Sequence, residues 1–304
     1  MKRVMSVSLG SSRRNHGVET EFLGEKFRIE RVGTDGDMDL AISIIRELDG
    51  RVDAFGMGGI DLYIYAGNKR YILRDAKRIA SAAETTPIVD GSGLKNTLEK
   101  LVIEKLDTQG LIPFRDRKVL VVSGVDRFGM AEAFTRLGAR VTFGDLIFGL
   151  GIPIPLHSLK SLERVAHCLA PLVSQLPFRV LYPTGKKQEQ VVPKFSSFYH
   201  AAEIIAGDFH FIRRYMPKKM NGQIIITNSI TTEDLDFLKD RGISQLVTTT
   251  PELEGRSFGT NVIEGVLVSI LGKHPEEITP ADYSALLARL QIEPRIVNLC
   301  GSYR

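Results

Sequence analysis

The feature that most constrains the fold is a regular alternation of short apolar segments and helical segments from residue 118 onward. The apolar segments are rich in Val and Ile and lack a period of two, which is typical of parallel strands that are covered on both faces. We predict strands at 118–122, 140–143, 179–182, 203–206, 223–227 and 245–249. We predict helices at 130–137, 159–174, 196–202 and 232–240. The alternation predicts an α/β fold with a doubly wound parallel sheet.

The first part of the chain predicts a mixed α/β domain. Strands are expected at 4–9, 52–55 and 87–89, and residues 21–32 predict a hairpin that turns at Gly24-Glu25. Asp37 is a plausible N-cap for a helix that ends at Leu48, because Asp accepts hydrogen bonds from the first free backbone N–H groups. Two further helices are expected at 76–83 and 94–106.

The length of 304 residues is twice that of a usual domain and predicts two domains. The polar segment 107–117 contains Gly110 and Pro113, and we place the boundary there. The expected division is a substrate-type α/β domain at 1–112 and a Rossmann-like nucleotide-binding domain at 113–260. C-terminal helices at 261–304 would pack back on the first domain, and Thr279 would cap the helix 280–290.

A glycine-containing turn follows the first strand of the second domain. It reads Ser123-Gly124-Val125-Asp126-Arg127-Phe128-Gly129, and a helix follows it. Backbone N–H groups of such a turn and of the helix N-terminus can hold a pyrophosphate. Asp145 lies 21 residues after Gly124 and could bind a ribose hydroxyl, which favours NAD over NADP. Asp126 replaces the usual middle glycine, so its charge must be offset by Arg127 or by a cap. A turn without a nucleotide stays an open alternative.

Two segments of the first domain could carry chemistry. Asp90-Gly91-Ser92-Gly93-Leu94 joins a strand to a helix, so Asp90 could exchange a proton in a cleft or could cap the helix. Lys95 follows in the same helix. Lys69 is a second candidate lysine, although its sequence, Gly67-Asn68-Lys69-Arg70, is also typical of a hairpin turn.

Serine residues follow the first strand. Ser8, Ser11 and Ser12 flank Gly10 and could hold a substrate carboxylate, with Arg13 or Arg14 supplying the charge. The alternative is a solvated turn.

Polar residues also follow two later strands. Thr227-Asn228-Ser229 and Thr248-Thr249-Thr250-Pro251-Glu252 stand where the strand ends of a doubly wound sheet line a ligand crevice, and Gly255–Asn261 comes next along the chain. Thr227 and Thr249 are therefore candidate cofactor contacts. Capping of helices by the same side chains is an equal alternative.

The composition limits the classes of binding partner that we expect. The formal net charge is only +4, from 40 basic and 36 acidic residues, so a nucleic-acid partner is not expected. Two cysteines and six histidines show no zinc or metalloprotease spacing, so we expect no metal site. The sequence predicts neither a signal peptide nor an apolar membrane span. We expect a soluble cytoplasmic protein with a small-molecule substrate and no membrane partner, and a homodimer is one candidate assembly.

The order of these parts resembles the shikimate and quinate 5-dehydrogenase family. Asp90-Gly91-Ser92-Gly93 is similar to the Asp-Gly-x-Gly part of the family's catalytic motif, and Ser8 and Ser11 resemble its carboxylate-binding serines. The resemblance implies a substrate domain followed by a nucleotide domain, with NAD or NADP as cofactor. The family's lysine would fall near 56–61, where this chain has none.

Together these patterns predict an NAD(P)-dependent oxidoreductase of a small hydroxylated carboxylic acid. Asp90 would transfer the proton, and Lys69 or Lys95 would keep it ionised. The alternative is a non-catalytic nucleotide or metabolite sensor built on the same two domains, which the missing lysine motif favours.

Overall fold

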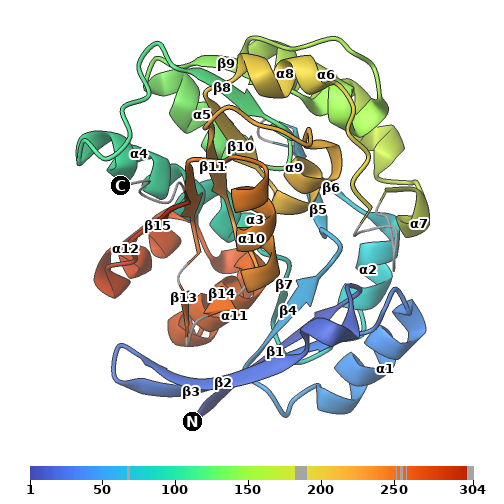
Figure 1. Cartoon of the computed structure of the whole chain (residues 1–304). Helices are drawn as coiled ribbons and strands as arrows, with labels where there is room; N and C mark the ends of the chain where they lie inside the picture. Colours follow the sequence, from blue (N-terminus) through green and yellow to red (C-terminus); the bar gives the residue numbers. More distant parts are fainter. Residues whose placement is uncertain (67–68, 182–189, 251, 254–255, 258, 300–304) are drawn as a thin grey trace. The chain divides into compact units, whose positions relative to one another are not determined.

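A computed structural model describes the chain except residues 67–68, 182–189, 251, 254–255, 258 and 300–304 (Figure 1). The chain divides into two compact units, each with its own sheet. Unit 1 contains Met1–Thr97, Cys168–Gln188 and Phe258–Ile292. Unit 2 contains Leu98–His167, Glu189–Ser257 and Glu293–Arg304. The chain therefore leaves each unit and returns to it.

The sheet of unit 1 has the order β2-β3-β1-β4-β7. The strands are β1 (Lys2–Ser8), β2 (His16–Phe22), β3 (Glu25–Gly33), β4 (Ala54–Gly58) and β7 (Ile88–Val89). β3, β1, β4 and β7 are parallel, and β2 pairs antiparallel with β3. The predicted hairpin is confirmed: Leu23 and Gly24 have φ of 53° and 84°, the left-handed pair that a tight two-residue turn requires.

The two faces of this sheet carry different residues. Met5, Val7, Phe55 and Met57 pack in one cluster with α1 (Met38–Leu48) and α2 (Arg74–Ala80). The alternate residues of the same strands point to the opposite face. There α11 (Thr260–Leu271) packs on β1 and β4, and α12 (Pro280–Leu290) packs on α11. Thr279 caps α12 with a capping box, as the sequence predicted.

Helix α11 approaches the strands so closely that glycine is required at its contacts. A Cβ on Gly56 would lie 2.8 Å from the Asn261 carbonyl oxygen, and one on Gly91 would lie 2.7 Å from the Asn261 nitrogen. At the other end of the helix, the Lys2 ammonium donates to the Ser269 carbonyl at 2.7 Å. Helix α11 therefore runs antiparallel to β1, and its N-terminus lies at the carboxyl edge of the sheet.

The sheet of unit 2 has the order β15-β12-β11-β10-β8-β9. Its strands are β8 (Lys118–Val121), β9 (Arg140–Phe143), β10 (Ile204–Gly207), β11 (Ile224–Thr227), β12 (Gln245–Thr248) and β15 (Arg295–Asn298). The first five are parallel, and β15 pairs antiparallel with β12. The order reverses between β8 and β10, which is the switch point where ligands bind in doubly wound folds.

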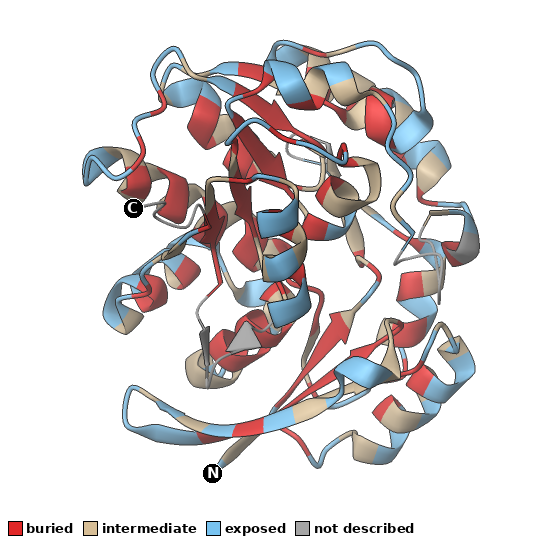
Figure 2. Ribbon diagram, in the orientation of Figure 1, coloured by how far each residue is buried: buried red, intermediate tan, exposed pale blue. Residues whose placement is uncertain are grey.

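Both faces of this sheet are buried, which confirms the α/β, Rossmann-like prediction (Figure 2). Leu120, Ile205, Ile225 and Leu246 share a core with residues of the helices on one face; these are α8 (Ser196–Ala201), α9 (Phe209–Tyr215) and α10 (Thr232–Asp240). The alternate strand residues are also buried: Val119, Val121, Ile204, Ala206, Ile226 and Val247. α5 (Phe128–Arg136) contacts β9 and α4 (Lys100–Thr108), and α6 (Leu159–Val173) follows a π-helical turn at Asp145–Gly149.

The prediction of a strand at 179–182 is wrong. Residues Phe178–Leu181 form a helical turn, α7, and Tyr182 lies outside the described residues. The Phe178 N–H donates to the Asp75 carboxylate at 2.8 Å, and the Val180 N–H donates to the Pro177 carbonyl at 2.9 Å. These tertiary and turn contacts override the strand preference of Val180 and its neighbours.

Other elements differ from the prediction in kind or were not predicted. The helix expected at 94–106 is divided into α3 (Ser92–Leu94), a π-helical turn at Lys95–Glu99, and α4. Strand β15 and helix α9 were not predicted. The antiparallel pairs β5 (Tyr63–Ala66) with β6 (Lys69–Ile72), and β13 (Glu252–Leu253) with β14 (Arg256–Ser257), were also missed as strands.

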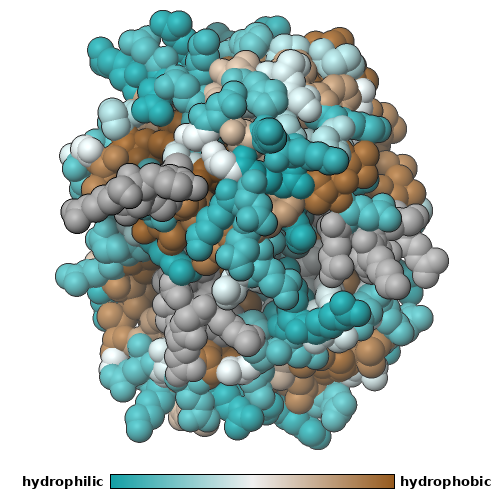
Figure 3. Space-filling view, in the orientation of Figure 1, coloured by the Kyte–Doolittle hydropathy of each residue, from teal (hydrophilic) through white to brown (hydrophobic). Residues whose placement is uncertain are grey.

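Within the described residues, no helix is long and apolar enough to cross a membrane. The face drawn in Figure 3 interleaves hydrophilic and apolar side chains.

The packing of α11 predicts the effect of enlarging Gly91. Gly91→Ala combines a left-handed backbone (φ 92°) with a clash against Thr260 and Asn261, so we expect a loss of about 3 kcal/mol or more in the free energy of unfolding. Gly110→Ala is the matched control, because Gly110 has φ 68° but nothing near its Cβ position, and it should cost about 1 kcal/mol. Chemical denaturation measures both, and equal losses would contradict the close approach.

Candidate functional site

The predicted site residues of unit 1 gather at one edge of its sheet. Ser8 ends β1, Gly58 ends β4 and leads to Asp61, and Asp90 follows β7. Since β1, β4 and β7 are parallel, their carboxyl ends lie at the same edge. The serine turn and the Asp90 turn therefore lie at the same edge of the sheet.

The Asp90 carboxylate is held by backbone groups. Its oxygens accept hydrogen bonds from the N–H groups of Leu62 at 2.6 Å, Tyr63 at 3.3 Å and Ser92 at 3.0 Å. Asp90 therefore ties the segment after β4 to the start of α3, and these bonds agree with the capping alternative. Whether it also exchanges a proton stays a prediction.

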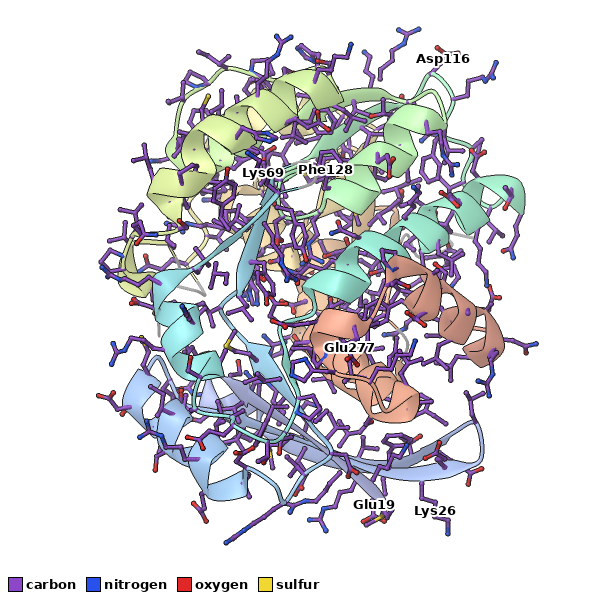
Figure 4. All side chains as sticks on the ribbon, turned by 180° about the vertical axis from the view of Figure 1, so that it is seen from behind. Glu19, Lys26, Lys69, Asp116, Phe128 and Glu277 are labelled. Atoms are coloured by element: carbon purple, nitrogen blue, oxygen red, sulfur yellow. The ribbon has the colours of Figure 1, made fainter. Side chains whose placement is uncertain are left out.

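Lys95 forms an ion pair at this edge. Its ammonium lies 2.6 Å from the Asp61 carboxylate, and the side chains are 8% and 22% exposed. Lys69, the other candidate lysine, is exposed at the start of β6, whose pairing places it three residues along the hairpin from Tyr63 (Figure 4). Of the two lysines, Lys95 is thus the buried one, and it lies beside the partly buried carboxylate of Asp61.

A buried carboxyl group and a phenol lie next to the same turn. The Tyr283 hydroxyl donates to Glu264 Oε1 at 2.7 Å, and Glu264 is 3% exposed. Burial and the nearby Asp90 charge raise the pKa of Glu264 to about 8, against the effect of the Tyr283 hydrogen bond. Glu264 is therefore largely protonated at neutral pH. A Cβ on Gly93 would lie 2.5 Å from Glu264 Oε1, so glycine is required there.

The three predicted serines have different environments. Ser8 is buried, and its hydroxyl oxygen accepts from the Gly10 N–H at 3.1 Å and from Arg31 at 3.0 Å. Ser11 caps a short 3-10 helix by accepting from the Arg13 N–H, and the Ser12 N–H donates to Asp35 at 2.9 Å. Ser8 is thus the serine set into the carboxyl edge, and Ser11 and Ser12 shape the turn after it.

In unit 2, Asp145 lies against the predicted phosphate turn. Its two oxygens accept from the N–H groups of Gly124 at 3.0 Å and Val125 at 2.9 Å. Burial raises the pKa of Asp145 to about 6, against the lowering effect of these bonds. A Cβ on Gly124 would lie 2.8 Å from the Leu162 side chain and 3.0 Å from the Phe143 ring. The glycine is therefore required by packing, whether or not a phosphate binds.

Arg127 is the main buried charge of unit 2. Its side chain is 2% exposed and pairs with the fully buried Glu99, with Asp208 at 2.9 Å and with Asp126 at 3.1 Å. The charge of Asp126 is thus offset by Arg127, as the sequence required. Phe128 and Gly129 begin α5, whose N-terminus has no side-chain cap.

Polar side chains continue along the carboxyl edge of unit 2. The Asn228 amide donates to Asp208 at 3.2 Å, and the Thr227 hydroxyl donates to the Gly207 carbonyl at 2.8 Å. Thr249 is fully buried, and its hydroxyl has no hydrogen-bond partner among the described residues. Pro251, Gly255 and Phe258, in the candidate segment after it, lie outside the described residues.

Sequence reasoning missed four residues of the unit 1 edge: Asp61, Glu264, Tyr283 and Arg31. Asp61 follows Gly58-Gly59 at a strand end, which is a usable signal. Glu264 stands within the otherwise apolar helix sequence Val262–Val268, and a single carboxyl there is a weak signal of a buried polar role. Among the described residues, no group of three or more potential ligands could hold a metal ion.

Family models cover most of the chain. The model described as "Domain of unknown function (DUF8754)" matches residues 93–299, more than half of the sequence. The chain belongs to this family. A second model, "Domain of unknown function (DUF8753)", matches residues 3–90. No curated protein matches the chain.

Several solved structures are distantly similar. The NAD-dependent malic enzyme of Thermotoga maritima is 13% identical, with a TM-score of 0.33, over 84% of this chain and 68% of that one. The L-tryptophan dehydrogenase of Nostoc punctiforme is 11% identical, with a TM-score of 0.37, over 95% and 80%. The malic enzyme of Entamoeba histolytica is 12% identical, with a TM-score of 0.40, over 95% and 61%. At these TM-scores the structural similarities support no conclusion. The assignment of the fold is based on the strand order of the sheets.

The raised pKa of Glu264 predicts a pH-dependent stability. The unfolded chain ionises this group near its ordinary pKa of 4.5 and the folded chain near 8, so its contribution to stability is lost as pH rises between these values. Glu264→Gln keeps an acceptor for Tyr283 and cannot ionise. Between pH 5 and about 8, we expect the free energy of unfolding of Glu264→Gln to exceed that of the wild type by on the order of a few kcal/mol. Urea unfolding across this range measures the gain. Glu276→Gln, at an exposed position, is the control, and parallel curves for wild type and Glu264→Gln would contradict the assignment.

Proposed function

We propose that the chain is an NAD(P)-dependent oxidoreductase acting on a small hydroxylated carboxylic acid. The observation that carries the proposal is the Lys95–Asp61 ion pair at the carboxyl edge of unit 1. A lysine that is nearly buried and held by a carboxylate is oriented for proton transfer. Its partner also offsets the cost of burying the ammonium.

The pair can move the proton of the reacting hydroxyl. In reduction, the Lys95 ammonium donates its proton to the carbonyl oxygen as that oxygen becomes a hydroxyl. In oxidation, the neutral amine accepts the proton from the hydroxyl. Asp61 holds the lysine in place at 2.6 Å in both directions. This assignment replaces Asp90 by Asp61 as the partner of Lys95, since the Asp90 oxygens already accept three backbone hydrogen bonds.

The Lys95–Asp61 pair also corresponds to the lysine and aspartate of the family that the sequence resembles. In shikimate and quinate dehydrogenases the lysine is expected near residues 56–61, and the aspartate comes from the Asp-Gly-x-Gly motif. Here the first segment ends in Asp61, and the lysine follows the second motif as Lys95. We infer that the lysine and the aspartate have exchanged places between these two segments, so that a lysine–aspartate pair is kept.

The residues of unit 2 fit a dinucleotide through two features. The first is the N-terminus of α5, which begins at Phe128 and has no side-chain cap, because the positive end of a helix favours a phosphate group. The second is the Asp145 carboxylate, whose two oxygens accept from the Gly124 and Val125 N–H groups and can each accept a further hydrogen bond from a ribose hydroxyl. Thr227 and Thr249 lie further along the same edge. A bound nicotinamide supplies the hydride acceptor or donor for the reaction.

A second candidate function is a non-catalytic nucleotide or metabolite sensor. The observation that favours it is the engagement of Asp90 by three backbone N–H groups, which gives this motif a structural role without chemistry. Binding of a dinucleotide and a hydroxy acid without turnover would support the sensor and overturn the enzyme.

The catalytic assignment predicts a contrast between two lysines. Lys95→Met should lower kcat at least about a hundredfold, because it removes the proton donor and acceptor, and Asp61→Asn should lower it about tenfold. Lys69→Met is the matched control and should leave kcat unchanged. The measurement is formation of the reduced dinucleotide with a panel of hydroxy acids that includes quinate and shikimate. Full turnover by a folded Lys95→Met variant would refute the assignment.

The cofactor assignment predicts a preference for NAD. The Asp145 carboxylate repels a ribose 2′-phosphate, so the wild type should bind NAD about tenfold more tightly than NADP, and Asp145→Asn should narrow this ratio. Asp116→Asn, at a 73% exposed carboxylate of unit 2, is the control. Gly129→Trp should abolish binding, since a large side chain at this buried position fills the start of α5. Isothermal titration calorimetry measures the affinity of the wild type and of each variant for NAD and NADP. The absence of binding to any adenine nucleotide would rule out a dinucleotide cofactor.

A further inference from the structure

We propose that Glu264 is a positioning residue for the Lys95–Asp61 ion pair. As a carboxylate it stabilises the ammonium form of Lys95, and as a neutral acid it allows the amine form that accepts a proton. The inference rests on the proposed function, because it concerns the state of Lys95 that is available for proton transfer. It assigns control of that state to a buried residue of α11.

Helix α11 carries Glu264 against the turn that leads from Asp90 to Lys95. A Cβ on Gly93 would lie 2.5 Å from Glu264 Oε1 and 2.8 Å from the Tyr283 ring. Gly93 stands between Asp90 and Lys95 in the sequence. Since Gly93 has no side chain, the carboxyl group can approach a turn that carries one charge of each sign.

The two oxygens of the Glu264 carboxyl group have different surroundings. Oε1 accepts a hydrogen bond from the Tyr283 hydroxyl at 2.7 Å, whereas Oε2 is buried and has no hydrogen-bond partner among the described residues. A buried charge without donors is far more costly than a buried neutral group. This geometry favours the protonated acid, and it agrees with the pKa of about 8 that burial and the Asp90 charge produce.

Ionisable side chains act on Glu264 from several elements. Asp90, in the turn after β7, opposes its ionisation, and Lys95 favours it. Tyr283 of α12 and Tyr65 of β5 also interact with it. The residues of β1 and β4 on the side of α11 carry no ionisable group; these are Val4, Ser6, Ser8, Ala54, Gly56 and Gly58. Lys95 is therefore the cation of this set.

The interaction between Glu264 and Lys95 acts in both directions. Lys95 favours the ionised form of Glu264, so the ionised form must favour the ammonium form of Lys95 by the same free energy. Both residues are buried, so solvent ions screen the interaction only weakly.

This coupling acts on the proposed reaction in one direction. Oxidation of the hydroxy acid requires a neutral Lys95 amine that accepts the proton of the hydroxyl. Ionisation of Glu264 near pH 8 keeps the proton on Lys95, and it therefore delays the rise of the oxidation rate with pH. Reduction uses the ammonium form and keeps its proton donor.

NMR of the lysine side chains tests the coupling without turnover. The full chain with isotope-labelled lysine is titrated from about pH 6 to about 10, and the Lys95 signal is assigned from its absence in Lys95→Met. We expect the wild-type Lys95 signal to shift in a step near pH 8, where Glu264 ionises, and Glu264→Gln to lack this step. The exposed Lys69 is the internal control, and its signal should show no such step.

A second variant moves the step instead of removing it. The Tyr283 hydrogen bond favours the ionised form of Glu264, so Tyr283→Phe should move the step to higher pH by about one unit. Glu276→Gln changes an exposed carboxylate and should leave the step in place. Thermal unfolding shows whether each variant is folded.

The pH profile of turnover tests the effect on catalysis. The rise of kcat for oxidation should be centred about one pH unit lower in Glu264→Gln than in the wild type, because the variant cannot place a second carboxylate beside Lys95. A loss of kcat at every pH with an unchanged profile would indicate a merely structural role and would overturn the inference.

The outcomes separate this inference from the proposed function. A step in the Lys95 signal that Glu264→Gln abolishes, without turnover of any hydroxy acid, would support the coupling and overturn the oxidoreductase. Turnover that requires Lys95, with no step near pH 8 or with the same step in folded Glu264→Gln, would support the oxidoreductase and overturn the coupling.

Discussion

The contact between α11 and the strands of unit 1 is the constraint on which this unit depends. The helix comes from residues 260–271, yet it lies against β1 and β4 near the start of the chain. Gly56 and Gly91 allow its N-terminus to approach, because any side chain at either position would overlap the backbone of α11. Its position fixes where Asn261 and Glu264 stand.

The same contact accounts for the polar chemistry of the unit. Glu264 is carried into the interior one helical turn after Asn261, and Tyr283 of α12 satisfies one of its oxygens. Because Asp90 lies close by, the interior favours the protonated form of Glu264. Lys95 and Asp61 pair in the part of the edge that Asp90 organises through Leu62 and Tyr63. The edge thus combines one neutral carboxyl group, one ion pair and one backbone-bound carboxylate.

The electrostatic balance of unit 2 depends on one arginine and a cluster of carboxylates. Its switch point gathers the carboxylates of Glu99, Asp126 and Asp208, and Arg127 is the cation that pairs with all three. Removal of such a partner would leave uncompensated buried charge, which is costly in a low-dielectric interior. Asp145 binds the turn from the other side. The turn is consequently shaped by its own side chains, and the N-terminus of α5 is the part of it that lacks a side-chain cap.

The regular elements that could be predicted from the sequence are those whose causes are local. Apolar Val and Ile runs gave the five parallel strands of unit 2, Asp37 and Thr279 marked helix starts, and the Gly24 turn marked a hairpin. The sequence also placed Ser8 and Asp90 at strand ends, which in a parallel sheet meet at one edge. Which charged side chains meet at that edge depends on tertiary packing. Lys95 with Asp61, Glu264 with Tyr283, and Arg31 with Ser8 join residues from different elements, and no local propensity encodes such pairs. The antiparallel β15 and the helical turn at Phe178 were decided in the same way, because their partners, β12 and Asp75, lie far away along the chain.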